Sequence, residues 1–281
     1  MKFFLSLINR RKAIHWFFFS NDIFCVDVNN LKDLEVFQPM KTERGFLEAV
    51  CLKDNLYVFG GRNNYNSITS VDKYSLTSKT WSHIAEMYDN RRYFCTCAFM
   101  NMIFFFGGFN DEVTTNSCFQ FDTKDYSWKE VARINEARSN AACVVFDERI
   151  VIAGGMNKTY NKLDTVKSYD VLPDKWSPMP NMNSGKRLHS LVVVKNKLFV
   201  ISQKAHSFEV FDNTSKTFVI LSPPKLIHSY KVISIENKIL FLENFQNKVL
   251  FYDVDKNEWS KKHCEVTKTL QQFSCVKVPC F

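Results

Sequence analysis

The chain has 281 residues, 46% hydrophobic and 15% aromatic, so it can bury a large core. Its net charge of +8 comes from scattered lysines and arginines that form no basic stripe, which excludes nucleic acid as the expected partner. Residues 1–12 hold an apolar stretch that is too short for a signal-peptide core or a membrane span. We therefore expect a basic N-terminal tail, a cytoplasmic location and no contact with membranes.

Short strands bounded by turn residues follow one another from residue 13, and no stretch shows sustained helical periodicity. The first three strands are expected near residues 14–19, 23–28 and 34–37. Units of four strands follow, and the third unit predicts strands at 93–100, 102–106, 117–121 and 127–132. One surplus strand remains after the last unit, at 269–278.

A repeat with a step of 47 residues runs through the middle of the chain. Its mark is a pair of glycines after a short apolar run, found at Gly60-Gly61, Gly107-Gly108 and Gly154-Gly155. An arginine stands 16 residues before the first glycine of each pair, at Arg44, Arg91 and Arg138. A period of about 40 to 50 residues built from short strands is typical of sheets repeated radially around an axis.

An aromatic residue and a second ring seven positions later occur in each of units two to six. The pairs are Tyr74/Trp81, Phe121/Trp128, Tyr169/Trp176, Phe211/Phe218 and Tyr252/Trp259. We expect these rings to pack between neighbouring sheets, where burial of one ring contributes roughly 2–3 kcal/mol. The glycines suit a crowded strand end because they adopt positive φ and allow close backbone approach.

The first unit lacks its first strand, and the surplus C-terminal strand can supply it. The sequence therefore predicts an all-β fold, a six-bladed β-propeller of four-stranded blades that closes when the C-terminal strand completes the N-terminal blade. Closure removes free sheet edges, which otherwise invite aggregation. The expected blades are residues 13–40 with 267–281, 41–87, 88–134, 135–182, 183–224 and 225–266.

The nine cysteines are an odd number. Cys51, Cys95, Cys97 and Cys143 lie within apolar strand patterns, where free thiols behave as small hydrophobic side chains. The Cys95-Thr96-Cys97 segment has no second Cys or His pair at zinc spacing. We expect core thiols in a reducing compartment and no metal site.

These residues resemble the kelch repeat, in which an apolar strand ends in Gly-Gly, a Tyr or Phe follows, and a Trp stands seven residues further on. An Arg opens the first strand of each kelch unit. The resemblance is specific in units two to four and degenerate elsewhere. The departures are Ser20-Asn21 in unit one, Ser202-Gln203 and Phe218 in unit five, and Glu243-Asn244 in unit six.

The chain is most similar to the C-terminal propeller of kelch-like proteins, which also carry a BTB and a BACK domain. The resemblance implies a module that binds a protein or peptide, as the substrate-recognition part of an adaptor for a cullin-based ubiquitin ligase. Other kelch proteins bind actin, which is the alternative. Because the chain shows neither a BTB nor a BACK domain, cullin binding is not expected from this chain alone.

The loops between the second and third strands are long only in units two to four. The first glycine and the following aromatic are 14, 14 and 15 residues apart there, against nine at the equivalent positions of units five and six. Binding commonly resides in long loops on a rigid scaffold, and kelch propellers place these loops on one face with the loops between units. The expected partner-binding residues are Arg62, Asn63, Tyr65, Tyr88, Arg92, Phe109, Asn135, Arg138, Asn157, Tyr160, Arg187 and His189.

Arginine and tyrosine are common binding hot spots, and arginine forks suit carboxylates, so we expect an acidic ligand. Arg44, Arg91 and Arg138 keep the register of the repeat, however, which favours a brace within the blade over ligand contact. For His189 the alternative is a solvated turn histidine.

The sequence contains no motif of a serine hydrolase, a zinc protease or a phosphate-binding loop. A kelch-type copper oxidase, the second alternative, needs a His/Tyr metal site, and the six histidines are spread along the chain. We therefore expect a binding module without a cofactor rather than an enzyme. An adaptor should co-purify with its substrate, an actin binder should pellet with filaments, and an oxidase should retain metal.

Overall fold

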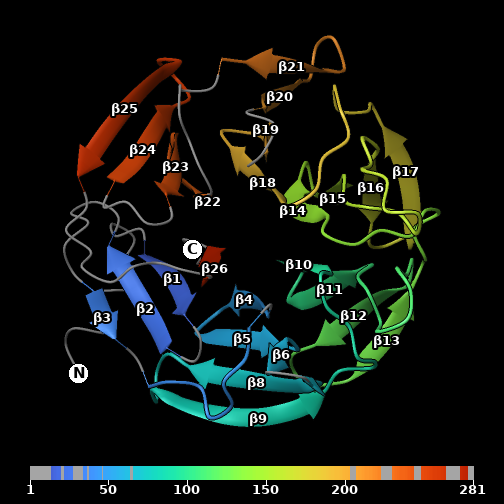
Figure 1. Cartoon of the computed structure of the whole chain (residues 1–281), viewed down its shortest axis with the longest axis vertical. Helices are drawn as coiled ribbons and strands as arrows, with labels where there is room; N and C mark the ends of the chain where they lie inside the picture. The colour runs from blue at the N-terminus through green and yellow to red at the C-terminus, as the bar shows by residue number, and fades with distance from the viewer. Residues whose placement is uncertain are drawn as a thin grey trace.

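The computed structural model describes residues 14–19, 22–27, 34–36, 38–45, 47–63, 66–202, 207–222, 230–243, 248–263 and 273–277. The regular elements in these ranges are β-strands, which form six four-stranded antiparallel sheets and one small hairpin. The sheets stand as blades around a central opening, with the first strand of each blade innermost (Figure 1). The predicted six-bladed propeller is confirmed.

Blades two to six are each hydrogen-bonded in chain order, as the alternation of short strands and turns requires. Blade two contains β4 (Glu48–Leu52), β5 (Asn55–Phe59), β8 (Ser70–Ser75) and β9 (Thr80–Glu86). Blade three contains β10 (Cys95–Phe99), β11 (Met102–Phe106), β12 (Cys118–Asp122) and β13 (Trp128–Val131). Blade four contains β14 (Ala142–Phe146), β15 (Arg149–Ala153), β16 (Val166–Asp170) and β17 (Lys175–Met179).

The last two blades keep the same order without a Gly-Gly pair. Blade five contains β18 (His189–Val194), β19 (Lys197–Ser202), β20 (Phe208–Asp212) and β21 (Thr217–Leu221). Blade six contains β22 (Tyr230–Ile235), β23 (Lys238–Glu243), β24 (Lys248–Asp253) and β25 (Glu258–His263). The hairpin of β6 (Arg62–Asn63) and β7 (Asn66–Ser67) lies in the long loop of blade two.

The C-terminal strand closes the ring. Blade one contains β1 (Ile14–Phe19), β2 (Asp22–Asp27) and β3 (Leu34–Val36), and β26 (Phe273–Lys277) pairs antiparallel with β1. β26 also contacts β22 and β4, the innermost strands of blades six and two. The predicted closure is therefore confirmed, and the described strand covers 273–277 of the expected 269–278.

The core lies between blades. The ring of Phe59 on β5 meets the rings of Phe105 on β11 and Trp128 on β13, at centroid distances of 4.7 and 6.3 Å. The ring of Phe106 meets that of Tyr169 across the next interface at 6.0 Å. Because both faces of each blade are covered by a neighbour, β11 can be an uninterrupted apolar run, Met-Ile-Phe-Phe-Phe.

Each tryptophan of the repeat ties its blade to the preceding one. The indole N–H of Trp128 donates to the carbonyl of Glu86 in blade two at 2.9 Å. The same bond joins Trp81 to Gln38, Trp176 to Ala132 and Trp259 to Ser222. The spacing of 42 residues between Trp128 and Glu86 is close to one repeat, so the bond recurs from blade to blade. Phe218, which replaces the Trp of blade five, has no N–H to donate.

The thiols described by the structure are free and packed among apolar side chains. Cys51, Cys95 and Cys118 are buried, and Cys97 and Cys143 are half-buried. Burial raises the pKa of Cys51 and of Cys118 to about 12, so both are poor nucleophiles. Among the described residues, no group of His, Cys, Asp or Glu side chains could hold a metal ion.

Candidate functional site

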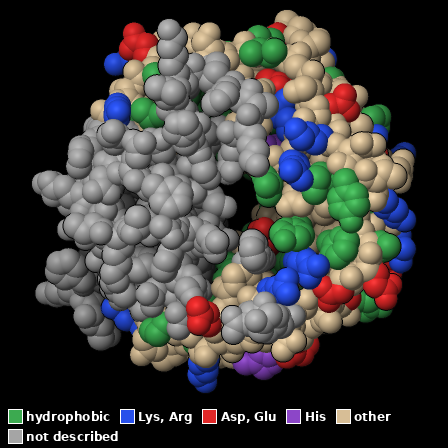
Figure 2. Space-filling view, in the orientation of Figure 1, with side chains coloured by type: hydrophobic (Ala, Val, Ile, Leu, Met, Phe, Trp, Pro, Cys, Tyr) green, Lys and Arg blue, Asp and Glu red, His purple; other side chains and the backbone are tan. Residues whose placement is uncertain are grey.

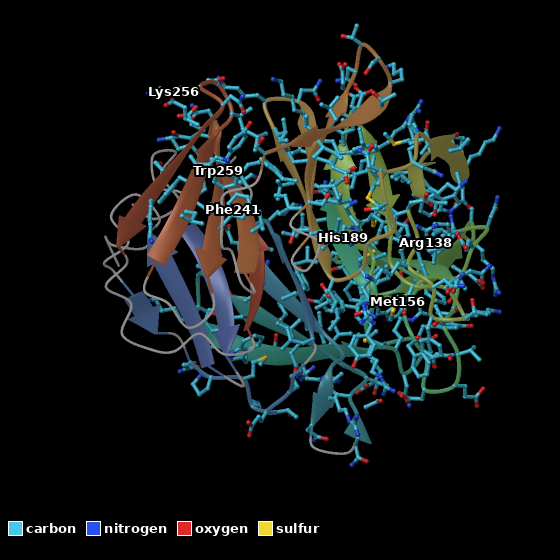
Figure 3. The ribbon with its side chains drawn as sticks, turned by 45° about the horizontal axis from the view of Figure 1, so that its top comes forward. Arg138, Met156, His189, Phe241, Lys256 and Trp259 are labelled. Carbon is cyan, nitrogen blue, oxygen red and sulfur yellow. The ribbon has the colours of Figure 1, made fainter. Side chains whose placement is uncertain are left out.

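The loops that follow the second strand and the loops that precede the first strand share one face of the propeller, because the strands of each blade run antiparallel. Backbone bridges between the two kinds of loop recur at the same register, joining Gly45 to Arg62, Arg92 to Phe109 and Ser139 to Met156. This surface is called the loop face below. In Figure 3, Arg138, Met156 and His189 lie close together on the side of blades four and five.

The repeat arginines lie inside the blades, under the loop face. Arg44, Arg91 and Arg138 are 1%, 3% and 0% exposed. Arg138 donates from Nη1 to the carbonyls of Gly154 at 3.1 Å and Thr165 at 3.4 Å, and from Nη2 to the Thr165 hydroxyl at 3.1 Å. Arg44 and Arg91 make the same bonds to their own first glycine and to a serine at the start of the third strand, Ser70 or Ser117. The expectation of ligand contact for Arg138 is wrong, because its guanidinium braces the blade.

In blade five a lysine takes the place of this arginine. Nζ of Lys186 lies 2.5 Å from Oε1 of Glu209, and neither side chain is exposed. Glu209 also accepts hydrogen bonds from Ser207 and Asn183. Burial raises the pKa of Glu209, but the hydrogen bonds from Lys186, Ser207 and Asn183 outweigh burial and bring the pKa below its ordinary value. The internal ion pair therefore replaces the carbonyl-binding guanidinium fork.

His189 is buried beside this pair, so its expected place on the surface is also wrong. Its Cε1 would lie 2.7 Å from a Cβ built on Gly154, which has φ 59°, and this close approach requires glycine there. Neither ring nitrogen makes a hydrogen bond of normal geometry within the described structure, although the backbone of Ala153 weakly favours the charged form. Burial, and then the nearby charge of Lys186, lower the pKa of His189 to about 4.

The long loops are held rigid by their own asparagines. Oδ1 of Asn157 accepts hydrogen bonds from the backbone N–H groups of Thr159 and Asn161, at 3.1 and 3.0 Å. In the preceding blade Asn110 accepts from the N–H of Val113 at 3.0 Å. Asn157 therefore organises its loop, and the loop presents Tyr160, which is 71% exposed.

The other expected binding residues divide by exposure. Arg62, Tyr88, Asn135 and Arg187 are exposed, and Asn63, Arg92 and Phe109 are half-buried. The ring of Tyr88 packs on Phe119 at 4.7 Å. Tyr65 lies outside the described residues.

Arg92 and Arg187 each follow the buried cation of their blade, Arg91 or Lys186, and they differ in their partners. Arg92 pairs with Asp111 at 2.8 Å and lies over the ring of Phe109 at 5.0 Å. The hydroxyl of Ser67 also donates to Asp111, at 3.1 Å. Arg187 contacts the sulfur of Met156 at 3.0 Å and forms no ion pair with any residue that the structure describes. Lys and Arg side chains gather beside the central opening with hydrophobic side chains between them (Figure 2).

Sequence reasoning missed Tyr93 and Leu188, which shortly precede the innermost strands β10 and β18 and are 37% and 47% exposed. Each stands two residues after the repeat arginine or its lysine substitute. Their left-handed backbone, with φ of 57° and 51°, carries no signal in the sequence because neither residue favours it. The sequence signal that could have found them is their equal distance, two residues, from the buried arginine or lysine.

A closed ring of blades with rigid loops on one face defines a β-propeller of the binding class. The family model described as the KLHDC2/KLHL20/DRC7 Kelch-repeats domain matches residues 14–202, about two-thirds of the chain. The chain belongs to this kelch-repeat family, whose propellers are generally binding modules. No curated protein matches the chain. No helix long and apolar enough to cross a membrane occurs in the described ranges.

Proposed function

We propose that this propeller binds a protein or peptide through the loop face of blades two to four, extended by Arg187 of blade five. The observation that carries the proposal is the set of three long loops on one face, two of them braced by their own asparagines at Asn110 and Asn157. A surface that is already ordered loses little conformational freedom on binding. The exposed Tyr88 and Tyr160 supply large rings of the kind that anchor interfaces.

The charge of the loop face suits an acidic ligand. Arg62, Lys158, Lys162 and Arg187 are exposed and form no ion pair with the residues that the structure describes. Glu112 and Asp164 are nearby acids of the same loops, so the excess is positive but modest. Binding should therefore weaken with added salt, because exposed charges are screened.

Within the cell we assign the propeller to substrate recognition for a cullin-based ubiquitin ligase in the cytoplasm. The kelch-family membership and the resemblance to kelch-like proteins support this role, and the free thiols suit a reducing compartment.

A pull-down from the source cells tests the proposal, comparing the wild type with an Arg62→Ala/Tyr160→Ala/Arg187→Ala variant. A matched control changes three exposed residues on the opposite face, Met100→Ala/Lys124→Ala/Leu172→Ala. Both variants should melt like the wild type, and only the loop-face variant should lose the partners. If the loop-face variant keeps the same partners at undiminished affinity, the binding face is elsewhere, and co-sedimentation with actin filaments then tests the opposite face.

A further inference from the structure

Three thiols meet at the interface between blades three and four. Cys95 and Cys97 lie two residues apart on β10, so they share one face of that strand. Their cross-strand partners, Phe106 and Phe104, belong to the apolar cluster that packs against blade four, and so do both cysteines. Cys143 on β14 belongs to the same cluster from the side of blade four. The thiols therefore approach one another from two different blades.

The repeat places Cys143 level with the gap between the other two cysteines. Cys95 and Cys97 stand four and six residues after the buried Arg91. Cys143 stands five residues after Arg138, the equivalent arginine of blade four. The innermost strands β10 and β14 lie side by side, with Cα atoms within 8 Å (Figure 1). The thiol of Cys143 is accordingly hydrogen-bonded to the thiols of both Cys95 and Cys97.

The three thiols differ in how they are covered. Cys95 is buried, and its thiol donates to the carbonyl of Phe106 at 3.9 Å. Cys97 is half-buried on a strand beside the central opening, where the molecule is hollowed (Figure 2). Burial, and then the neighbouring thiols, raise the pKa of Cys143 well above its ordinary value, so this thiol stays protonated at neutral pH. A small reagent therefore reaches Cys97 first.

We propose that Cys97 and Cys143 form a reversible disulfide between blades three and four when the protein meets a peroxide. Two thiols that already contact each other can be bridged with little movement of the backbone. The blade pattern does not require cysteine at these positions, because the equivalent residues of blade two are Val50 and Ala49. The two cysteines are therefore an addition to the repeat.

The reaction takes two steps and consumes one peroxide. The sulfur of Cys97 attacks one oxygen of hydrogen peroxide, the O–O bond breaks, and the thiol proton leaves with the other oxygen as water. The sulfur of Cys143 then attacks the sulfenic acid on Cys97, the S–O bond breaks, and the proton of Cys143 leaves with the hydroxyl group as a second water. Two thiols are oxidised to one disulfide while the peroxide is reduced to water. A small thiol such as glutathione restores both cysteines by exchange.

The protonated state of Cys143 makes the second step slow, because only a thiolate attacks. A brief exposure to peroxide therefore leaves the pair reduced, whereas sustained exposure closes the bond. The disulfide joins the innermost strands of two consecutive blades, and it restrains the unfolded chain between them. The oxidised protein should consequently unfold at a higher temperature than the reduced protein.

Counting the free thiols of the full chain tests the proposal. The protein is treated with hydrogen peroxide, the peroxide is removed with catalase, and the unfolded chain is alkylated and weighed by mass spectrometry. The untreated wild type should carry nine alkyl groups, one for each cysteine, and the oxidised wild type seven. Dithiothreitol before alkylation should restore nine. A count that stays at nine after prolonged treatment overturns the proposal.

Variants taken from the chain's own pattern assign the bond. Cys97→Val and Cys143→Ala introduce the residues that blade two has at these positions, so the packing of an innermost strand is preserved. After peroxide, both should keep all their remaining thiols free. Cys95→Ala and the matched control Cys51→Ala, at a buried thiol outside the cluster, should still lose two. Loss of two thiols in Cys97→Val or Cys143→Ala contradicts the proposal.

Thermal melting followed by circular dichroism measures the same bond without a substitution. The oxidised wild type should melt several degrees above the reduced wild type, because the cross-link restrains the unfolded chain. Cys143→Ala treated with peroxide should melt like its untreated form. Equal melting temperatures for the oxidised and reduced wild type contradict a bond between the two blades.

Discussion

One buried arginine braces each of blades two to four, and its guanidinium binds carbonyl oxygens beside the ends of the second and third strands. In blade four these are the carbonyls of Gly154 and Thr165, and the Thr165 carbonyl also accepts the N–H of Gly154. The glycine pair and the arginine recur together because the arginine binds the oxygen of the first glycine. The spacing of 16 residues recurs because it separates the two partners of one hydrogen bond, the arginine and the first glycine of the pair.

Arg138→Met should destabilise the protein by about 3 kcal/mol, because the buried Gly154 carbonyl is left unpaired, at a cost of roughly 1–3 kcal/mol, and the bonds from the guanidinium to Thr165 are also lost. The midpoint of urea unfolding measures the loss. Arg187→Met, at an exposed position, serves as the control and should leave the midpoint unchanged. Equal midpoints for Arg138→Met and the wild type would show that the brace is dispensable.

His189 gives the protein an acid sensitivity that begins well above the pKa of its carboxylates. Its pKa is about 4 in the folded protein and 6.5 ordinarily, so the unfolded chain binds a proton first as the pH falls. Stability is complete above pH 6.5 and is lost toward pH 4. Between pH 7 and pH 5 the loss should be about 2 kcal/mol, at 1.36 kcal/mol per unit.

His189→Phe should remove this loss, because phenylalanine has a similar shape and cannot bind a proton, and the His189 ring nitrogens make no hydrogen bond of normal geometry in the described structure. Urea midpoints at pH 7 and pH 5 should then be nearly equal. Acid loss in the variant should begin only near pH 4.5, the ordinary pKa of a glutamate, as Glu209 protonates. A variant with the same decline between pH 7 and pH 5 would assign the effect to another group.

At the scale of elements, the outer strand of each blade is attached to its neighbour through one indole. Trp128 on β13 combines a hydrogen bond to Glu86 with ring contacts to Phe59, Phe105 and Phe121. The ring contacts and the hydrogen bond contribute separately to the free energy of unfolding. Two substitutions at this position can therefore measure each contribution.

Trp128→Ala should cost about 3–5 kcal/mol, the usual effect of removing a large ring from a core. Trp128→Phe introduces the residue type found at Phe218 of blade five. Apart from the loss of buried apolar area, it should destabilise the protein by about 1 kcal/mol, the net contribution of the lost hydrogen bond. Chemical unfolding followed by circular dichroism gives both values. Equal midpoints for the wild type and Trp128→Ala would show that the ring contributes nothing to blade attachment.

The sequence is most informative about elements whose pattern is repeated. The strands of blade three lie within three residues of their expected ends, because apolar runs and turn residues bound them on both sides. Arg138 and His189 were misplaced for a different reason. Arg138 precedes its first strand and His189 begins one, in segments whose residue types suggest exposure, and both are buried by close approach to a glycine of the preceding blade, Gly107 or Gly154.

The loop face shows the same division. Loop lengths and exposed rings such as Tyr160 were readable from the sequence, since they depend on local residues. The pairing of Arg92 with Asp111 could not be read from the sequence. The same holds for the backbone hydrogen bonds that link Tyr93, Asn140 and Leu188, because these contacts depend on how the chain packs.

For the whole molecule, closure depends on one strand. Deleting residues 267–281 removes β26, leaves blade one with three strands and exposes the edges of β1 and its neighbours. The truncated chain should lose a sharp thermal transition or melt at a much lower temperature in circular dichroism. A control deletion of residues 278–281 leaves β26 in place. A truncated chain that melts like the full chain would show that β26 does not contribute to the ring.

The pairing of β1 with β26 also sets the order of assembly. Phe19 lies opposite Phe273, 254 residues further along the chain, whereas blades two to six form from consecutive segments. Contacts so distant in sequence are slow to form, so the loop face is complete before the ring is sealed. During synthesis the inner edge of β1 lacks its partner strand, and at high concentration the β26 of a second copy can pair with this edge. Exchange of this strand gives a domain-swapped dimer whose loop faces are intact.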